Sequence, residues 1–184
     1  MSAPSSSRAV SSVIATVLMV AIVVILAATI SVYGLGFADD ITRPGPLVGQ
    51  SSGELVSQDG NDGGIVRIRH IAGDTVQVRN MEIVVDATEA CGKQSRLVGL
   101  PATSGNSISD SNIEGDDIFD EGSYNSDRTP DKNAIHRSEY ATGDEIAFRI
   151  PSTDCSIDRG EEIEVRVVHT PTNSVIITQT LTVT

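Results

Sequence analysis

The pattern of hydrophobic and polar residues divides the chain into two parts of opposite character. From Val10 to Ala38 no residue is charged, and the run consists mainly of Val, Ile, Leu, Ala and small hydroxyl side chains. As an α-helix it would extend roughly 43 Å, more than the ~30 Å hydrocarbon core of a bilayer. A helix that is apolar on every side has no face for water. The pattern therefore predicts a helix over residues 10–38 that ends in lipid or among other helices.

Beyond residue 64 the apolar positions alternate with polar ones, with the period of two that is typical of half-buried β-strands. The phase slips by one residue near Arg79-Asn80, which predicts a bulge or a strand break there. Residues 162–169 and 174–183 flank the turn Pro171-Thr-Asn173 and predict a hairpin. We expect an α+β protein in which a long N-terminal hydrophobic α-helix precedes a mainly-β, sandwich-like domain at residues 65–184.

Between the helix and the strands, residues 39–64 are rich in Gly, Pro, Ser and Asp. Arg43-Pro-Gly-Pro46 excludes a helix, and the Asp- and Gly-rich stretch at 59–64 is a turn signal. The composition predicts a semi-stiff, extended linker over this segment.

The polar part of the chain is strongly acidic. Residues 39–184 hold all 25 acidic residues and 12 of the 13 basic ones, a formal charge of −13. Such a surface argues against nucleic acid as a partner, because phosphate contacts need Lys and Arg. The abundance of acids over lysine and the shortage of aromatic residues resemble the composition of proteins from salt-loving archaea. An ordinary acidic extracellular domain is the alternative.

Hydropathy alone leaves three interpretations of residues 1–38 open. A cleaved secretory signal has an apolar core of ~7–15 residues and ends at a small-x-small site, and the stretch 13–30 is longer than that. A permanent single-span anchor fits the length, with Arg8 inside and the acidic domain outside. In the third interpretation a peptidase cuts before the apolar run, so that the helix stays on the mature chain.

The stretch RAVSSVIATVLMVAIVVILAATISVYGLGF resembles the N-terminus of archaeal type IV pilins, particularly those of haloarchaea. The resemblance lies in the short polar leader, Arg8-Ala9 and the apolar segment that follows. It implies a leader peptide at residues 1–9 and cleavage by the prepilin peptidase between Ala9 and Val10. The bacterial relatives usually carry Glu at the fifth mature position, where this chain has Ile14. Archaeal relatives commonly lack that Glu, so its absence points to the archaeal branch.

The resemblance also implies a function and partners. The precursor would sit in the cell membrane with its domain facing outward, and would then join a homopolymer, or related pilin subunits, in an extracellular filament for adhesion or biofilm formation. The alternative is a single-pass, membrane-anchored extracellular binding module that does not polymerise. The residues expected to pack helix against helix are Val13, Ile14, Val17, Leu18, Val20, Ala21, Val24, Ile25 and Ala28.

No residue pattern in the chain suggests an enzyme or a cofactor. Cys91 and Cys155 can form a disulfide in an exported domain or remain two buried thiols. His70 and His169 lie on predicted strands, where a structural role with satisfied ring nitrogens is expected. A calcium loop is a weak candidate because the spacing follows the template only in part, and a solvated acidic loop is the alternative. Its ligands would be Asp110, Asn112, Glu114 and Glu121.

Overall fold

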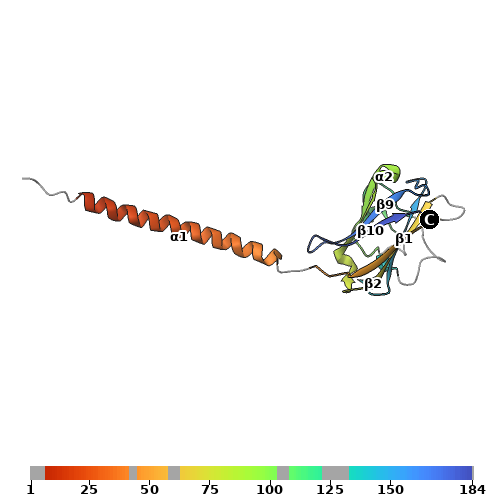
Figure 1. Cartoon of the computed structure of the whole chain (residues 1–184), viewed down its shortest axis with the longest axis horizontal. Coiled ribbons are helices and arrows are strands. Elements are labelled where there is room, and N and C mark those ends of the chain that lie inside the picture. Colours follow the sequence, from red (N-terminus) through yellow and green to blue (C-terminus); the bar gives the residue numbers. More distant parts are fainter. Residues whose placement is uncertain (1–6, 42–44, 58–62, 103–107, 122–132, 184) are drawn as a thin grey trace, which may run out of the picture. The chain divides into compact units, whose positions relative to one another are not determined.

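The chain folds into two compact units, Met1–Pro44 and Gly45–Thr184. The computed structural model describes residues 7–41, 45–57, 63–102, 108–121 and 133–183, and within the helix the side chains of residues 13–31. In the described residues the first unit consists of a helix, and the regular structure of the second is mainly strands (Figure 1). The fold class expected from the sequence is thereby confirmed as an apolar helix followed by a mainly-β domain.

The helix α1 spans Ser7–Ile41 and contains the whole of the predicted helix. It continues through Gly34 and Gly36, and it runs three residues past the predicted end at Ala38. Asp39 and Asp40 end the apolar run, but acidic residues are compatible with helical backbone. The change in polarity therefore marked the limit of the hydrophobic surface and not the end of the helix.

The second unit contains three antiparallel sheets. One has the order β1-β2-β8, a second β10-β9-β4-β5-β6, and the third pairs β3 with β7. The strands are β1 (Gln50–Ser57), β2 (Gly63–Ala72), β3 (Val76–Gln77), β4 (Met81–Ala87), β5 (Lys93–Leu97), β6 (Ile113–Gly115), β7 (Glu139–Tyr140), β8 (Glu145–Pro151), β9 (Glu162–His169) and β10 (Ser174–Thr182). The short helices are η1 (Val78–Asn80), α2 (Thr88–Cys91), η2 (Asp110–Asn112) and η3 (Ala134–His136).

The two larger sheets bury their inner faces in one common core, as in a β-sandwich. The alternation is complete in β4, where every second residue is buried. The three-stranded sheet contributes Val66, Ile68, Ile146, Phe148 and Ile150 to this core. The five-stranded sheet contributes Ile83, Val85, Leu97, Ile163, Val165 and Val167. This alternation is the pattern from which the strands were predicted.

Two local predictions are confirmed. Strands β9 and β10 pair antiparallel, with Ser174 opposite His169, so the expected hairpin forms. At the predicted phase slip the 3-10 helix η1 separates β3 from β4. The turn at Arg79 and Asn80 lets Val78 and Met81 both point into the core, although they are three residues apart.

The predicted linker over residues 39–64 is wrong at residues 39–41, 50–57 and 63–64, which are helix or strand, and its residues 42–44 and 58–62 lie outside the described part of the chain. Its first residues belong to α1, and β1 lies within it and pairs along its full length with β2. Only Leu55 of β1 is deeply buried, and apart from Val56 the strand is otherwise Gln, Ser, Gly and Glu, so its sequence lacks the apolar alternation of a strand. A Cβ atom at Gly53 would lie 2.6 Å from a methyl carbon of Leu181, so glycine is what lets β1 pack against β10.

Candidate functional site

The largest exposed apolar surface of the chain is the central part of α1. Residues Val13–Ser31 have a mean hydropathy of 3.0, and none of them is buried within the chain. Their large side chains are more than half exposed, for example Met19 and Ile30 at 70 %. A water-exposed surface of this kind is strongly unfavourable at about 25 cal/mol per Å². The helix therefore requires an apolar environment around it.

The few polar side chains in this segment make hydrogen bonds within the helix. The hydroxyl of Thr16 donates to the carbonyl of Val13 at 2.9 Å, and that of Thr29 donates to Leu26 at 2.8 Å. Ser31 donates in the same way to Ala27 at 2.9 Å. Because these donors are satisfied locally, they add little to the cost of placing the helix in lipid or among other helices.

The helix is apolar on all sides, but its side chains are sorted by size. At about 100° per residue, residues 13–31 divide into two faces. The slim face carries only Val, Ala, Thr and Ser: Val13, Thr16, Val17, Val20, Ala21, Val23, Val24, Ala27, Ala28 and Ser31. The bulky face carries every Leu, Ile and Met of the segment: Ile14, Leu18, Met19, Ile22, Ile25, Leu26 and Ile30, together with Ala15 and Thr29. Slim side chains allow two helix backbones to approach closely.

The predicted helix-packing residues are all exposed, and they fall on both faces. Ile14, Leu18 and Ile25 are on the bulky face, and the other six are on the slim face. The predicted set therefore does not distinguish the two faces, although the helical period of the sequence contains that information. The predicted cleavage site, Ala9 and Val10, lies in the helical backbone of α1, and its side chains are outside the described part of the chain.

The β-domain begins with a segment that is fixed to two turns. A Cβ atom at Gly45 would lie 2.5 Å from the hydroxyl of Ser174, so the chain passes directly against the β9–β10 turn. Further along, Leu47 donates its backbone N–H to a carboxylate oxygen of Asp74 at 3.0 Å. The N–H of Asp74 donates in return to the carbonyl of Leu47 at 2.9 Å. We call this end of the domain the junction pole and define it as residues 45–48, 71–75 and 170–175.

The junction pole exposes apolar side chains. Outside α1, the exposed large hydrophobic residues in the described chain are Leu47 (71 %), Ile71 (39 %) and Val175 (51 %), and all three belong to this pole. Its single charged residue is Asp74, whose carboxylate is already bonded to Leu47. No local pattern in the sequence indicates this pole, because its three segments are far apart along the chain.

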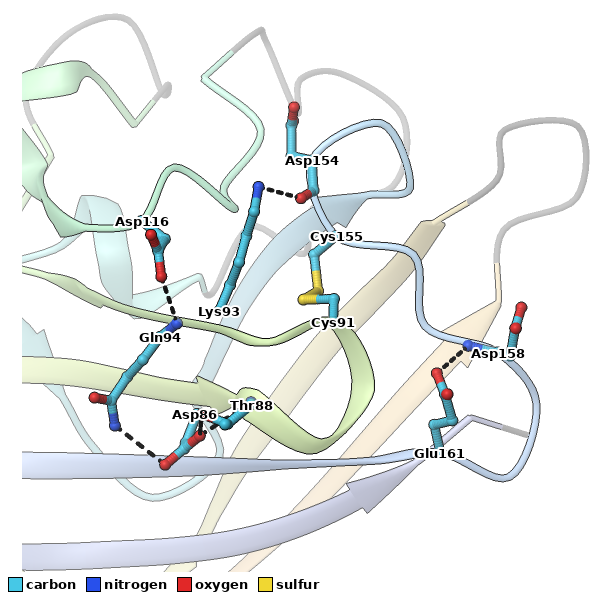
Figure 2. Close-up of a disulfide and its surroundings, with 10 residues drawn as sticks. All are labelled: Asp86, Thr88, Cys91, Lys93, Gln94, Asp116, Asp154, Cys155, Asp158 and Glu161. Carbon is cyan, nitrogen blue, oxygen red and sulfur yellow. Dashed lines mark hydrogen bonds between the residues drawn. A yellow bond between two sulfur atoms is a disulfide. The ribbon is translucent and has the colours of Figure 1, made fainter.

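The other end of the strands carries the disulfide between Cys91, in α2, and Cys155 (Figure 2). The Cα atoms are 5.5 Å apart, and the bond closes a loop of 64 residues. Lys93 donates its ammonium group to the carbonyl of Asp154 beside the bridge. The bridge thereby ties β5 and α2 to the segment that leads into β9.

Acidic side chains surround this end. The backbone N–H of Gln94 donates to Asp116, and that of Asp158 donates to Glu161, as Figure 2 shows. Hydrogen bonds from the hydroxyl and the N–H of Thr88 lower the pKa of the Asp86 carboxyl. The registers Met81 with His169 and Asp86 with Glu164 place the acidic end and the junction pole at opposite ends of β4 and β9.

The weak calcium candidate is not assembled as a ligand cage. Asp110 forms a side-chain hydrogen bond with Glu121, which raises the pKa of Glu121 to about 7. The amide of Asn112 donates instead to the carbonyls of Val98 and Gly99, at 3.0 and 3.3 Å. Glu114 lines a surface hollow on the five-stranded sheet with Arg96. Within the described residues, no group of three or more His, Cys, Asp or Glu is placed to hold a metal ion.

The two strand histidines differ from each other. His169 contacts the hydroxyl of Thr172 at 2.7 Å through Nδ1. His70 is fully buried against the ring of Tyr140, with 5.0 Å between ring centres, and among the described residues neither of its nitrogens has a hydrogen-bond partner. The expectation of satisfied ring nitrogens is thus wrong for His70. Burial raises the pKa of Tyr140, whose hydroxyl donates to the carbonyl of Ile68 at 3.1 Å.

Comparison with known proteins identifies the N-terminal segment. Residues 8–46 match the family model described as archaeal type IV pilin, N-terminal. The match starts at the basic residue before the predicted cleavage site and covers all of α1 from that point. It confirms the resemblance to archaeal type IV pilins that the sequence showed. No curated protein matches the chain.

Proposed function

We propose that this chain is a structural subunit of an archaeal type IV pilus-like surface filament. The observation that carries the proposal is the fully exposed, 19-residue apolar segment of α1, which lies inside the pilin match and is joined to a separately folded domain. In this function α1 forms the filament core, and the β-domain forms the outer surface. The role is mechanical and adhesive rather than enzymatic.

The precursor is held in the cell membrane by α1, with the acidic domain outside. Prepilin peptidase cleaves between Ala9 and Val10, which removes the leader and its Arg8 and keeps the helix. A helix that leaves lipid for a bundle of identical helices exchanges one apolar environment for another, so little burial free energy is lost. The slim face supplies the close backbone contacts that a bundle gains over lipid.

The domain surface fits an extracellular setting in concentrated salt. The formal charge of −13 on residues 39–184 is screened within about 3 Å at 1 M salt, which favours a haloarchaeal source. A disulfide is typical of an exported domain. Such a filament would act in adhesion and biofilm formation, through contacts between its outer domains and an external surface.

A charge in the middle of α1 tests the proposal. Val20→Asp places a carboxylate on the slim face, which costs roughly 2.5–3.5 kcal/mol at the centre of an apolar helix. Cells that make this variant as their sole copy are expected to lack filaments in electron micrographs, and cells with Val20→Ile are expected to keep them. Normal filaments from Val20→Asp would show that α1 does not form the core. Normal surface display without any filaments from the unchanged chain would favour the non-polymerising membrane anchor.

A further inference from the structure

The edges of the two larger sheets are protected in different ways. Within the described residues, β1 and β8 are the edge strands of one sheet, and β10 and β6 are those of the other. Strands β1 and β10 lie against each other, and the side-chain amide of Gln179 donates to the carbonyl and the hydroxyl of Ser51 at 3.3 and 2.9 Å. Strand β6 has only three residues. Strand β8 has seven, which makes it an edge long enough to pair with another chain.

A side-chain amide occupies the middle of this edge. Asn133, only 4 % exposed, donates from Nδ2 to the carbonyl of Ala147 at 2.9 Å. Its Oδ1 accepts the N–H of Ala147 at 3.1 Å. A carboxamide offers the same donor and acceptor as a peptide group. Asn133 therefore supplies to Ala147 the two hydrogen bonds that a neighbouring strand would otherwise make.

The amide of Asn133 is itself held in position. The N–H of Ile135, in η3, also donates to its Oδ1, at 3.2 Å. The backbone of Asn133 forms a parallel bridge with Glu145, two residues before Ala147. These contacts fix the residue along β8 and orient the amide toward the strand.

The rest of the edge is covered by other loop residues. The N–H of Asp120 donates to the carbonyl of Arg149 at 3.0 Å, and the guanidinium of Arg149 donates to the Asp120 carboxylate at 3.0 Å. Pro151 has no N–H, and its carbonyl accepts from the N–H of Cys155 at 2.9 Å. Hydrogen bonds of this kind satisfy the strand without extending the sheet, so β8 presents no open ladder at these positions.

The sequence of β8 would suit pairing with itself if the edge were open. Antiparallel strands from two copies that met about Ala147 would exchange two N–H to C=O bonds between the two Ala147 residues. The same register would place Glu145 of each copy opposite Arg149 of the other. Opposite charges directly across a strand pair are stabilising. The strand is therefore self-complementary, and its edge is the one that needs protection.

We infer that Asn133 seals β8 against strand addition and that the strand it excludes is β8 of a second copy of this chain. The seal acts within the β-domain and does not depend on the proposed filament. Wherever many copies are held close together, an open β8 would join domains edge to edge in competition with ordered contacts. Asn133 removes that competing mode of association.

Binding of a strand peptide tests the seal. The probe is a fluorescently labelled peptide that copies residues 145–151, titrated against the full chain in detergent, with a scrambled peptide as a control. Asn133→Ala is expected to bind the peptide roughly tenfold more tightly than the unchanged chain does, because two main-chain hydrogen bonds become available. Exchange of the Ala147 amide hydrogen is expected to accelerate in this variant and to slow again when the peptide is added.

A matched variant separates sealing from stability. Asn112→Ala also removes a buried amide, one that donates to the carbonyls of Val98 and Gly99 and not to β8. It is expected to lower the melting temperature in the same way as Asn133→Ala but to bind the peptide no better than the unchanged chain. Equal binding of the peptide by the two variants, or binding by neither, would overturn the inference.

The charges of the peptide report the direction of pairing. Arg149→Glu in the peptide places a carboxylate opposite Glu145 of the chain in the antiparallel register and is expected to weaken binding to Asn133→Ala. Tighter binding of this peptide would indicate a parallel arrangement and would overturn the proposed pairing of β8 with β8.

A second substitution covers the case in which Asn133→Ala does not fold. Asn133→Asp keeps the acceptor for the N–H of Ala147 and loses the donor to its carbonyl, so it is expected to bind the peptide with an affinity between those of the unchanged chain and Asn133→Ala. If Asn133→Ala is unfolded, tighter binding by Asn133→Asp than by the unchanged chain supports the seal. Loss of the folded domain in both variants would make Asn133 a structural residue only and would overturn the inference.

Discussion

Leu47 and Asp74 form a reciprocal pair of hydrogen bonds that fixes the start of the β-domain. The carboxylate of Asp74 accepts the N–H of Leu47 at 3.0 Å, and the N–H of Asp74 donates to the carbonyl of Leu47 at 2.9 Å. The pair ties the first residues of the domain to the β2–β3 turn. An exposed leucine is thereby presented at a fixed position on the β-domain.

Removing the carboxylate of this pair is expected to loosen the junction pole. Asp74→Ala deletes one hydrogen bond of about 1 kcal/mol and leaves the β-core untouched. Amide hydrogen exchange at Leu47 and Val48 is expected to accelerate, whereas exchange in β4 and β9 stays at the rate of the unchanged chain. Asp74→Asn keeps an acceptor oxygen and is the control. Unchanged exchange at Leu47 in Asp74→Ala would show that the carboxylate does not hold this segment.

The two faces of α1 are expected to respond differently to the same substitution. Ala21→Leu enlarges the slim face, and Ala15→Leu adds the same three carbons to the bulky face. Because close helix contacts depend on small side chains, Ala21→Leu is expected to reduce the number of filaments in electron micrographs more than Ala15→Leu does. Both variants should reach the membrane in equal amounts. If both reduce assembly equally, the sorting by size has no role in packing.

The acidic pair Asp110 and Glu121 is expected to make the domain less stable as pH rises. The hydrogen bond to Asp110 and the repulsion from nearby carboxylates raise the pKa of Glu121 from its ordinary value of 4.5 to about 7. Between these values the folded chain holds a proton that the unfolded chain has released. The stabilisation is therefore complete below pH 4.5 and is lost as pH rises through about 7.

Denaturant unfolding at pH 5 and pH 8 measures this effect. The unchanged domain is expected to be more stable at pH 5, and Glu121→Gln is expected to remove most of the difference. The Asp86 carboxyl has a lowered pKa and is ionised throughout this interval, so it does not contribute. A difference of the same size in Glu121→Gln would assign the pH dependence to other groups.

The disulfide is expected to contribute substantially to the stability of the domain. Its loop of 64 residues restricts the unfolded chain, and bridges of this kind are worth about 2–4 kcal/mol. The double variant Cys91→Ala, Cys155→Ala is expected to melt at a lower temperature in reducing and oxidising buffer alike. The unchanged chain should melt at that lower temperature only after reduction. A melting temperature that is insensitive to reductant would contradict the assignment.

The sequence predicted those parts of the fold whose residues follow a simple period. Ile163, Val165 and Val167 alternate with polar residues because one face of β9 is buried. The phase slip at Arg79 indicated η1, because the turn there changes which alternate positions of the chain face the core. Strand β1 was not predicted, because a glycine within a segment usually indicates a loop or a weak strand. Gly53 is accommodated in β1 because the strand packs closely against Leu181, which is distant in the sequence. Local patterns carry no information about such an approach.

Of the candidate site, the helix could be predicted from the sequence and the junction pole could not. The apolar run and Arg8-Ala9 predicted the helix and its family, because both features are contiguous in the sequence. The junction pole needs Leu47, Ile71 and Val175 at one end of the domain, and that grouping depends on how the strands are ordered. The amide of Asn112, one of the calcium candidates, bonds to the backbone of Val98 and Gly99, which a loop template does not foresee.

The intact mass of the chain recovered from sheared surface filaments tests the central claim most directly. The account predicts that this fraction contains the chain with the mass of residues 10–184 and one disulfide. A mass that includes residues 1–9 would contradict cleavage before the helix. A mass that lacks α1 altogether, or the absence of the chain from the filament fraction while it is abundant in the membrane, would contradict a filament core made of α1.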